Sequence, residues 1–174
     1  MKSILISIQP KWCELIANGK KTVEVRKTKP KLETPFKVFI YETKSLYKPL
    51  GCKHFSIGEG KVIGEFICNE ITVAERGSYC VLPKSKTLID ELDLLEYADG
   101  KTVYGWHISD LVIYDKPKEL NRFQKPCIRD CDCGGCENAY YTRDYGFEGC
   151  ALEEGLTRPP QSWCYVEGSD NNGE

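Results

Sequence analysis

Residues 3–26 of the chain read SILISIQPKWCELIANGKKTVEVR, and this stretch holds the succession of elements that decides the fold. Its first part, at 3–8, is a short apolar run typical of a buried strand. Pro10 suits the first turn of a helix, because that position needs no backbone N–H donor. Gly19 can adopt the left-handed conformation that ends many helices. We therefore predict a strand followed by a helix over residues 10–18.

A charged strand is predicted directly after this helix. In the run TVEVR, Thr22, Glu24 and Arg26 alternate with two valines. Successive side chains of a strand point to opposite faces, so the two valines share one face and the polar residues share the other. We expect the valines to enter the core and the charged face to be wet.

The rest of the chain predicts more strands than helices. In residues 36–42, apolar side chains occupy both odd and even positions, which is typical of a strand with both faces buried. Residues 61–73 predict a strand that bends near Gly64, and the leucine spacing in residues 88–99 predicts a second amphipathic helix. Residues 101–117 return to extended structure. This order favours an α+β fold, a small mixed, partly open β-barrel with flanking helices.

Length and composition indicate one globular domain. The chain has 174 residues, of which 41% are hydrophobic and 29% charged, as is usual for a domain with a core of its own. We assign the domain to residues 1–167 and a loose tail to residues 168–174. The apolar stretch near the N-terminus is too short for a secretory signal, and no segment is apolar enough to span a membrane. We therefore expect a cytoplasmic protein.

Charge is distributed unevenly along the chain. Residues 1–53 hold 12 Lys and Arg against 4 Asp and Glu, whereas residues 54–174 hold 12 against 22. A near-neutral total can hide a basic face that attracts phosphate. The alternative is two solvated faces that neutralise each other across the fold, and charge alone favours neither.

The junction between the first helix and the following strand resembles a known family. Gly19-x-Lys21-x-x-Glu24-x-Arg26 is similar to the signature of the ASCH family of the PUA-like superfamily. The segments SIQPKW, YET and RPPQSWCYVE also resemble bacterial and phage members. The resemblance implies a PUA-like β-barrel with helices packed on it, and a cleft beside the first helix where the signature residues gather. It also implies binding of RNA or recognition of a modified base.

The same residues suit such a ligand on chemical grounds. Lys21 and Arg26 are cations that can bind phosphate, while Glu24 can accept from a base amino group or hold the cations in place. The basic loop that follows adds Lys27 and Lys29, with a further lysine two residues on. The alternative is that the glutamate and arginine form an exposed ion pair worth less than about 1 kcal/mol. We expect the cluster to bind RNA or a nucleotide-like molecule.

Two tryptophans could complete the site. Trp106 and Trp163 are candidates for stacking a base, a contact worth about 1 to 3 kcal/mol. The alternative for both is packing in the core, where large aromatic side chains are common.

Hydrolysis is the alternative function. The resemblance extends to small ASCH-like amidohydrolases that act on acylated cytidine through a lysine, a threonine and a glutamate. Lys21 matches the lysine, but Glu24 stands where the threonine nucleophile is expected. Thr22 is a poor substitute, because adjacent side chains of a strand point apart. A metal-independent ribonuclease that uses the Lys–Glu–Arg cluster for acid–base chemistry is the other form of this alternative.

A cysteine-rich insert is predicted over residues 127–150. Cysteines in a reducing compartment more often bind metal than form disulfides. Five thiols could supply ligands for one structural zinc ion: Cys127, Cys131, Cys133, Cys136 and Cys150. Free or redox-sensitive thiols and a docking surface for an unknown protein partner are the alternatives.

Overall fold

The computed structural model describes residues 2–44, 46–47, 56–126, 139–142, 146–150 and 155–167. Its helical segments are α1 (Pro10–Ala17), η1 (Tyr79–Val81), α2 (Lys84–Thr87), α3 (Glu91–Ala98) and η2 (Leu120–Arg122). Its strands are β1 (Lys2–Ile8), β2 (Val23–Arg26), β3 (Phe36–Glu42), β4 (Leu46–Tyr47), β5 (Ser56–Ile57), β6 (Val62–Ala74), β7 (Val103–Lys118), β8 (Ala139–Thr142), β9 (Gly146–Cys150) and β10 (Trp163–Glu167).

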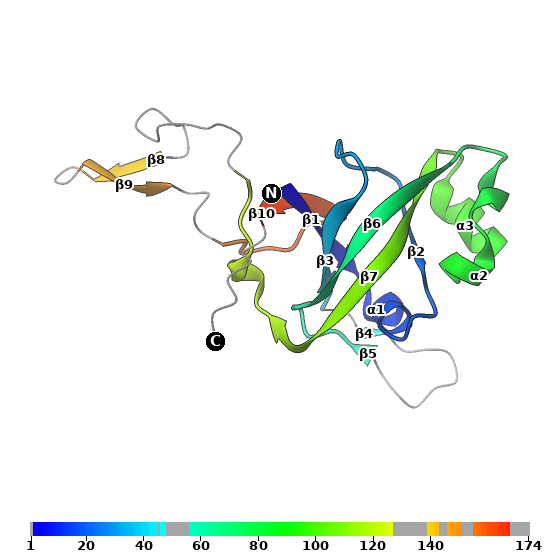
Figure 1. Ribbon diagram of the computed structural model, residues 1–174, viewed down its shortest axis with the longest axis horizontal. Helices are drawn as coiled ribbons and strands as arrows, with labels where there is room; N and C mark the ends of the chain where they lie inside the picture. Colours follow the sequence, from blue (N-terminus) through cyan, green and yellow to red (C-terminus); the bar gives the residue numbers. More distant parts are fainter. Residues whose placement is uncertain are drawn as a thin grey trace.

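A six-stranded mixed sheet forms the centre of the fold, in the order β10-β1-β3-β6-β7-β2. Strand β1 runs parallel to β3 and antiparallel to β10, and the other pairs are antiparallel. In Figure 1, α2 and α3 lie together at one end of this sheet, beside β2 and β7. The α+β class predicted from the sequence is therefore confirmed.

The predicted barrel is wrong, because the sheet is open. Both edges of β1 are occupied by β10 and β3, so no edge remains for a ladder to β2. The four-residue strand β2 instead reaches β1 through a side chain, since Arg26 Nη2 donates to the Ser7 carbonyl over 2.7 Å. This contact lies beside the site described below.

The first half of the chain follows its sequence pattern closely. The predicted strand at 3–8 and helix at 10–18 correspond to β1 and α1, and Gly19 has the left-handed φ of 71°. The register between β6 and β7 shifts between Val62 and Gly64, which confirms an irregularity at the predicted bend. Five of the seven residues of β3 are buried, as its apolar pattern predicts.

The second predicted helix differs from its pattern. A left-handed residue, Leu88 with a φ of 55°, separates α2 from α3, so the helix begins only at Glu91. Leu94 and Ala98 are the residues of α3 that enter the core, whereas Leu92 is 79% exposed. Leucine spacing therefore predicted the helix and its end at Asp99, but not its buried face.

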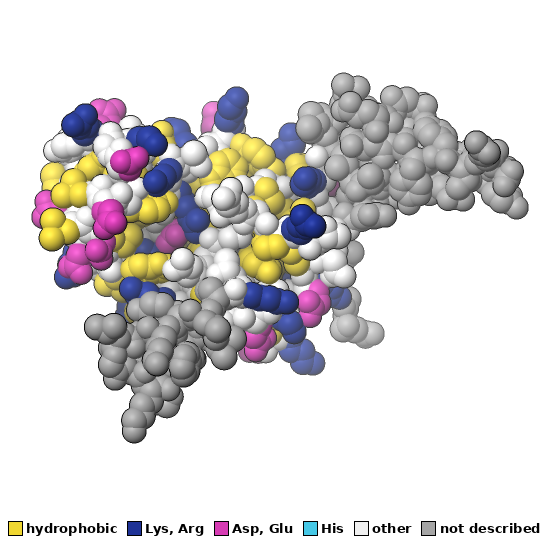
Figure 2. Space-filling model, turned by 180° about the vertical axis from the view of Figure 1, so that it is seen from behind, with side chains coloured by type: hydrophobic (Ala, Val, Ile, Leu, Met, Phe, Trp, Pro, Cys, Tyr) yellow, Lys and Arg dark blue, Asp and Glu magenta, His cyan; other side chains and the backbone are white. Residues whose placement is uncertain are grey.

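Charged side chains are interspersed on the surface. On the face seen in Figure 2, basic and acidic side chains are mixed, and the acidic ones are most frequent over the end formed by α2 and α3.

Candidate functional site

The turn between α1 and β2 positions the signature residues. Gly19 ends the helix with a left-handed φ, and the Lys21 N–H donates to the Leu15 carbonyl over 2.8 Å. The next residue is tied to the neighbouring helix, because the Thr22 N–H donates to the Lys86 carbonyl over 3.0 Å. The lysine side chain lies between α1 and α2, with Nζ 4.8 Å from the centre of the Trp12 ring and hydrogen-bonded to the Thr87 carbonyl.

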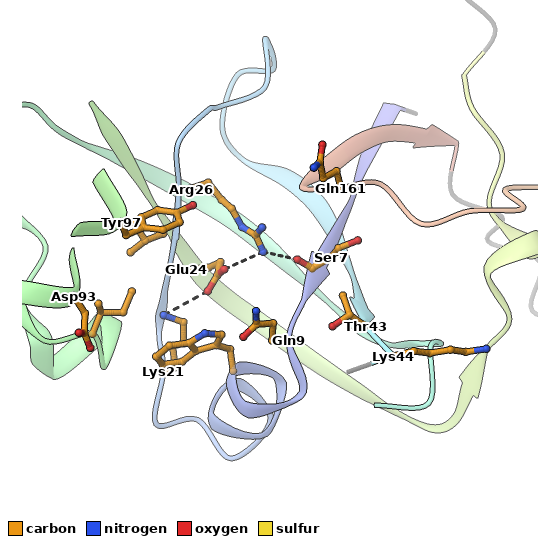
Figure 3. Close-up of a pocket in the computed structure, with 13 residues that line it drawn as sticks. Ser7, Gln9, Lys21, Glu24, Arg26, Thr43, Lys44, Asp93, Tyr97 and Gln161 are labelled. Carbon is orange, nitrogen blue, oxygen red and sulfur yellow. Dashed lines mark hydrogen bonds and ion pairs between the residues drawn. The ribbon is translucent and has the colours of Figure 1, made fainter. Parts of the chain in front are cut away.

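Lys21, Glu24 and Arg26 form one continuous chain of ionic contacts (Figure 3). Lys21 Nζ lies 3.4 Å from Glu24 Oε2, and Arg26 Nη2 lies 3.0 Å from Glu24 Oε1. Lys21 Nζ also donates to the Thr87 carbonyl over 2.6 Å. The glutamate therefore lies between two cations, each of which is also anchored to backbone.

The charged face of β2 is buried, contrary to the wet face that we predicted. Lys21 is 1% exposed and Glu24 is 6% exposed, and the side chain of Arg26 is 12% exposed. The interpretation as an exposed surface pair is therefore excluded. Burial lowers the pKa of Lys21 below its ordinary value, while the Glu24 carboxylate acts in the opposite direction. A buried cation of this kind depends on its partner for stability.

A cavity of about 470 Å³ opens beside this cluster and is lined by all three signature residues. Trp12 of α1 and Tyr97 of α3 contribute aromatic side chains, and Gln9 and Gln161 contribute amides. Figure 3 shows Gln9 near the centre of the site and Gln161 on the segment before β10. The cavity thus combines charge, aromatic surface and neutral hydrogen-bonding groups, which is usual for small-molecule sites.

Arg26 carries an unsatisfied donor in this cavity wall. Its Nε is buried and has no hydrogen-bond partner among the described residues. A buried donor left in this state costs about 1 to 3 kcal/mol. Because Nε has almost no accessible surface, the Arg26 side chain must move before an acceptor atom can reach it.

The basic loop lies outside the cavity. Lys27 Nζ is 5.0 Å from the centre of the Tyr97 ring, and Lys29 Nζ is 5.7 Å from the centre of the Tyr104 ring. Both lysines are exposed, so they contribute positive charge near the cavity without lining it.

The two tryptophans pack against each other. Trp106 is fully buried, with its ring centre 6.0 Å from that of Trp163 and 5.7 Å from that of Phe36. A buried ring has no free face for a base, so the stacking predicted for Trp106 gives way to core packing. Trp163 is partly buried and donates from Nε1 to Thr28 Oγ1 over 2.9 Å. It does not line the cavity either.

Sequence reasoning missed the residues that complete the cavity. Gln9 and Gln161 each lie beside a proline-containing segment that the family resemblance included, and this was the one available signal. Tyr97 and Asp93 come from α3, about 70 residues away from Lys21 along the chain. Nothing in a single sequence joins these segments.

The predicted zinc ligands cannot be placed. The side chains of Cys127, Cys131, Cys133, Cys136 and Cys150 lie outside the described residues, so the zinc site stays a prediction and the insert is not supported by the structure. Within the parts of the chain that the structure describes, no group of three His, Cys, Asp or Glu residues could hold a metal ion. No helix in these parts is long and apolar enough to cross a membrane.

Comparison with known proteins gives the family. Residues 6–119 match the ASCH domain. The chain belongs to the ASCH domain family. This is a PUA-like family linked to RNA binding, and no curated protein matches the chain.

Solved structures of ASCH proteins share the fold. The chain is similar to the crystal structure of ASCH from Zymomonas mobilis, with a TM-score of 0.58 and 18% identity over 95% of this chain and 87% of that one. A variant of the Zymomonas mobilis protein gives the same TM-score and identity over 96% and 91% of the two chains. A second variant is 17% identical over 95% and 88%, also with a TM-score of 0.58. At such identities the likeness shows the fold alone.

Proposed function

We propose that this ASCH domain binds RNA or a modified nucleotide in the cavity beside Lys21, Glu24 and Arg26. The observation that carries the proposal is a buried chain of two cations and one carboxylate in the wall of a cavity of about 470 Å³. A cavity of this volume lies within the range of small-ligand sites. The family's link with RNA binding supports the same ligand class.

Each part of the cavity has a role in this proposal. The Arg26 guanidinium, whose side chain lines the cavity and is 12% exposed, is assigned to a phosphate or carbonyl oxygen of the ligand. The amides of Gln9 and Gln161 can pair with the edge of a base, since an amide both donates and accepts. Trp12 and Tyr97 supply aromatic surface for the base itself.

The basic loop acts at longer range. Lys27 and Lys29 are exposed and follow Arg26 directly along the chain. Their charge attracts a polyanion and makes its affinity fall as salt concentration rises, because bound cations are released from the nucleic acid.

The test is a titration that leaves the buried ionic chain intact. Fluorescently labelled mixed-sequence RNA and nucleoside monophosphates are titrated into the wild-type protein and into Gln161→Ala and Tyr97→Leu. We expect both substitutions to weaken binding roughly ten-fold, about the contribution of one good contact. Asn69→Ala is the matched control, because Asn69 is an exposed amide that does not line the cavity. Failure of the wild-type protein to bind either probe contradicts the proposal.

One observation favours hydrolysis as the second candidate. Burial lowers the pKa of Lys21, and a lysine in that condition can act as a general base. Hydrolysis of an acylcytidine would add water across the amide bond and release cytidine and a carboxylate. Chromatography after incubation with acylcytidine and with labelled RNA separates the two functions. Turnover lost in Lys21→Met, in protein shown to be folded by circular dichroism, supports the enzyme; intact substrates support binding alone.

A further inference from the structure

A second cavity adjoins the first. It has a volume of about 700 Å³ and lies between the end of β3, η2 and the segment that precedes β10. Thr43 and Lys44 line both cavities. No motif in the sequence pointed to this space.

Two chain segments contribute to both cavities, which therefore lie next to each other. Thr43 and Lys44 form one shared border. The segment 156–161 forms another, because it contributes Leu156 and Thr157 to the second cavity and Gln161 to the first. This segment is held against β1, where Ser7 Oγ donates to the Pro160 carbonyl over 2.6 Å. A ligand that occupied both cavities would cross these borders.

The wall of the second cavity is fixed by close backbone packing. Gly155 lies so near the Asn121 carbonyl that an added Cβ would come within 1.6 Å of the oxygen. The next N–H, that of Leu156, donates to the Phe123 carbonyl over 2.8 Å. The space is therefore shaped in advance of binding, which lowers the entropy lost when a ligand is bound.

The lining suits one further nucleotide. Lys44 is exposed, and Figure 3 shows its side chain extending away from the Lys21–Glu24–Arg26 cluster. An ammonium group at the border of two cavities can bind the phosphate that links two nucleosides. Asn121 and Thr157 offer hydrogen bonds, and Leu156 offers apolar surface for a base or sugar. Among the described residues of the lining, the one carboxylate is that of Glu119, which is paired with Lys61 over 3.2 Å.

We propose that the second cavity is a subsite for the neighbouring nucleotide of a single-stranded oligonucleotide. One base occupies the cavity beside the signature residues, the linking phosphate lies at Lys44, and the next nucleotide contacts Asn121 and Leu156. This inference rests on the proposed function and adds the size of the ligand: at least two nucleotides. A paired duplex does not fit, since each base must enter a cavity of its own.

The test measures affinity against ligand length. Labelled mixed-sequence RNA of one to six nucleotides is titrated into wild-type protein, Asn121→Asp and Lys44→Ala. We expect roughly ten-fold or more tighter binding on going from one nucleotide to two or three, and little gain beyond. Asn121→Asp places a negative charge in the second cavity and removes this gain while leaving mononucleotide affinity unchanged. Lys44→Ala reduces the gain and lowers the salt dependence of binding to the longer RNA.

Matched controls make the outcomes distinct. Asn69→Asp and Arg76→Ala make the same changes of charge at exposed positions that line neither cavity, and they should bind like wild type. Equal affinity for mononucleotide and trinucleotide, or an unchanged gain in Asn121→Asp, overturns the second subsite and leaves the proposed function standing. Absence of binding at every length overturns both.

Discussion

Replacing Glu24 by glutamine tests whether the buried ionic chain holds the site together. Glutamine keeps the shape of glutamate but removes its charge, and it presents an NH₂ group to one of the two cations. Glu24 is 6% exposed, and its carboxylate contacts Lys21 at 3.4 Å and Arg26 at 3.0 Å. Leaving a buried charge without its partner costs about 3 to 5 kcal/mol. Because glutamine can still accept one hydrogen bond, we expect a loss at the lower end, about 3 kcal/mol.

Urea unfolding followed by tryptophan fluorescence measures this loss. For a chain of this length, a loss of about 3 kcal/mol also lowers the midpoint of thermal unfolding by roughly 6 to 12 °C. The control is Glu119→Gln, which breaks an ion pair with Lys61 at 3.2 Å whose glutamate side chain is 62% exposed. That change should cost less than about 1 kcal/mol. If Glu24→Gln costs no more than Glu119→Gln, the cluster does not stabilise the fold and the reasoning is refuted.

Three further predictions concern pH, thiols and metal. The pKa of Lys21 is lower in the folded than in the unfolded chain, so between these two pKa values the unfolded state binds more protons. The free energy of unfolding of wild type, relative to that of Lys21→Met, should therefore rise as the pH approaches about 10.5. Urea unfolding curves of both proteins at increasing pH check this, and a difference that does not change with pH contradicts it. Burial raises the pKa of Cys68 to about 12, so a maleimide at pH 7.5 should label exposed Cys80 long before Cys68. Mass spectrometry of the peptides measures the two labelling rates, and equal rates contradict this prediction. The cysteines of 127–150 predict one zinc per chain, and metal analysis of reduced, untagged protein that finds none removes that prediction.

Local pattern predicted the elements that make the site. The order of β1, α1 and β2 follows from residues close together in sequence, because apolar runs, Pro10 and the glycine cap act over a few residues. The family resemblance, not local pattern, led us to expect the signature residues in one cleft, and all three line the same cavity.

Tertiary structure decided what the sequence could not. Alternation placed Glu24 on a polar face, but whether that face meets water depends on α3 and on the segment before β10, which are distant along the chain. The same limit applies to Trp106, whose burial reflects neighbours on other strands. The open sheet also depends on long-range pairing, since β10 rather than β2 takes the free edge of β1.

The pairing of β1 with β10 has a consequence for biosynthesis. Lys2 lies opposite Glu167 in this ladder. More than 150 further residues must therefore be translated before β10 can cover the outer edge of β1. Meanwhile β1, with six buried residues out of seven, offers bare N–H and C=O groups to other chains. A nascent chain stalled before β10 should therefore be prone to aggregation and a client for chaperones.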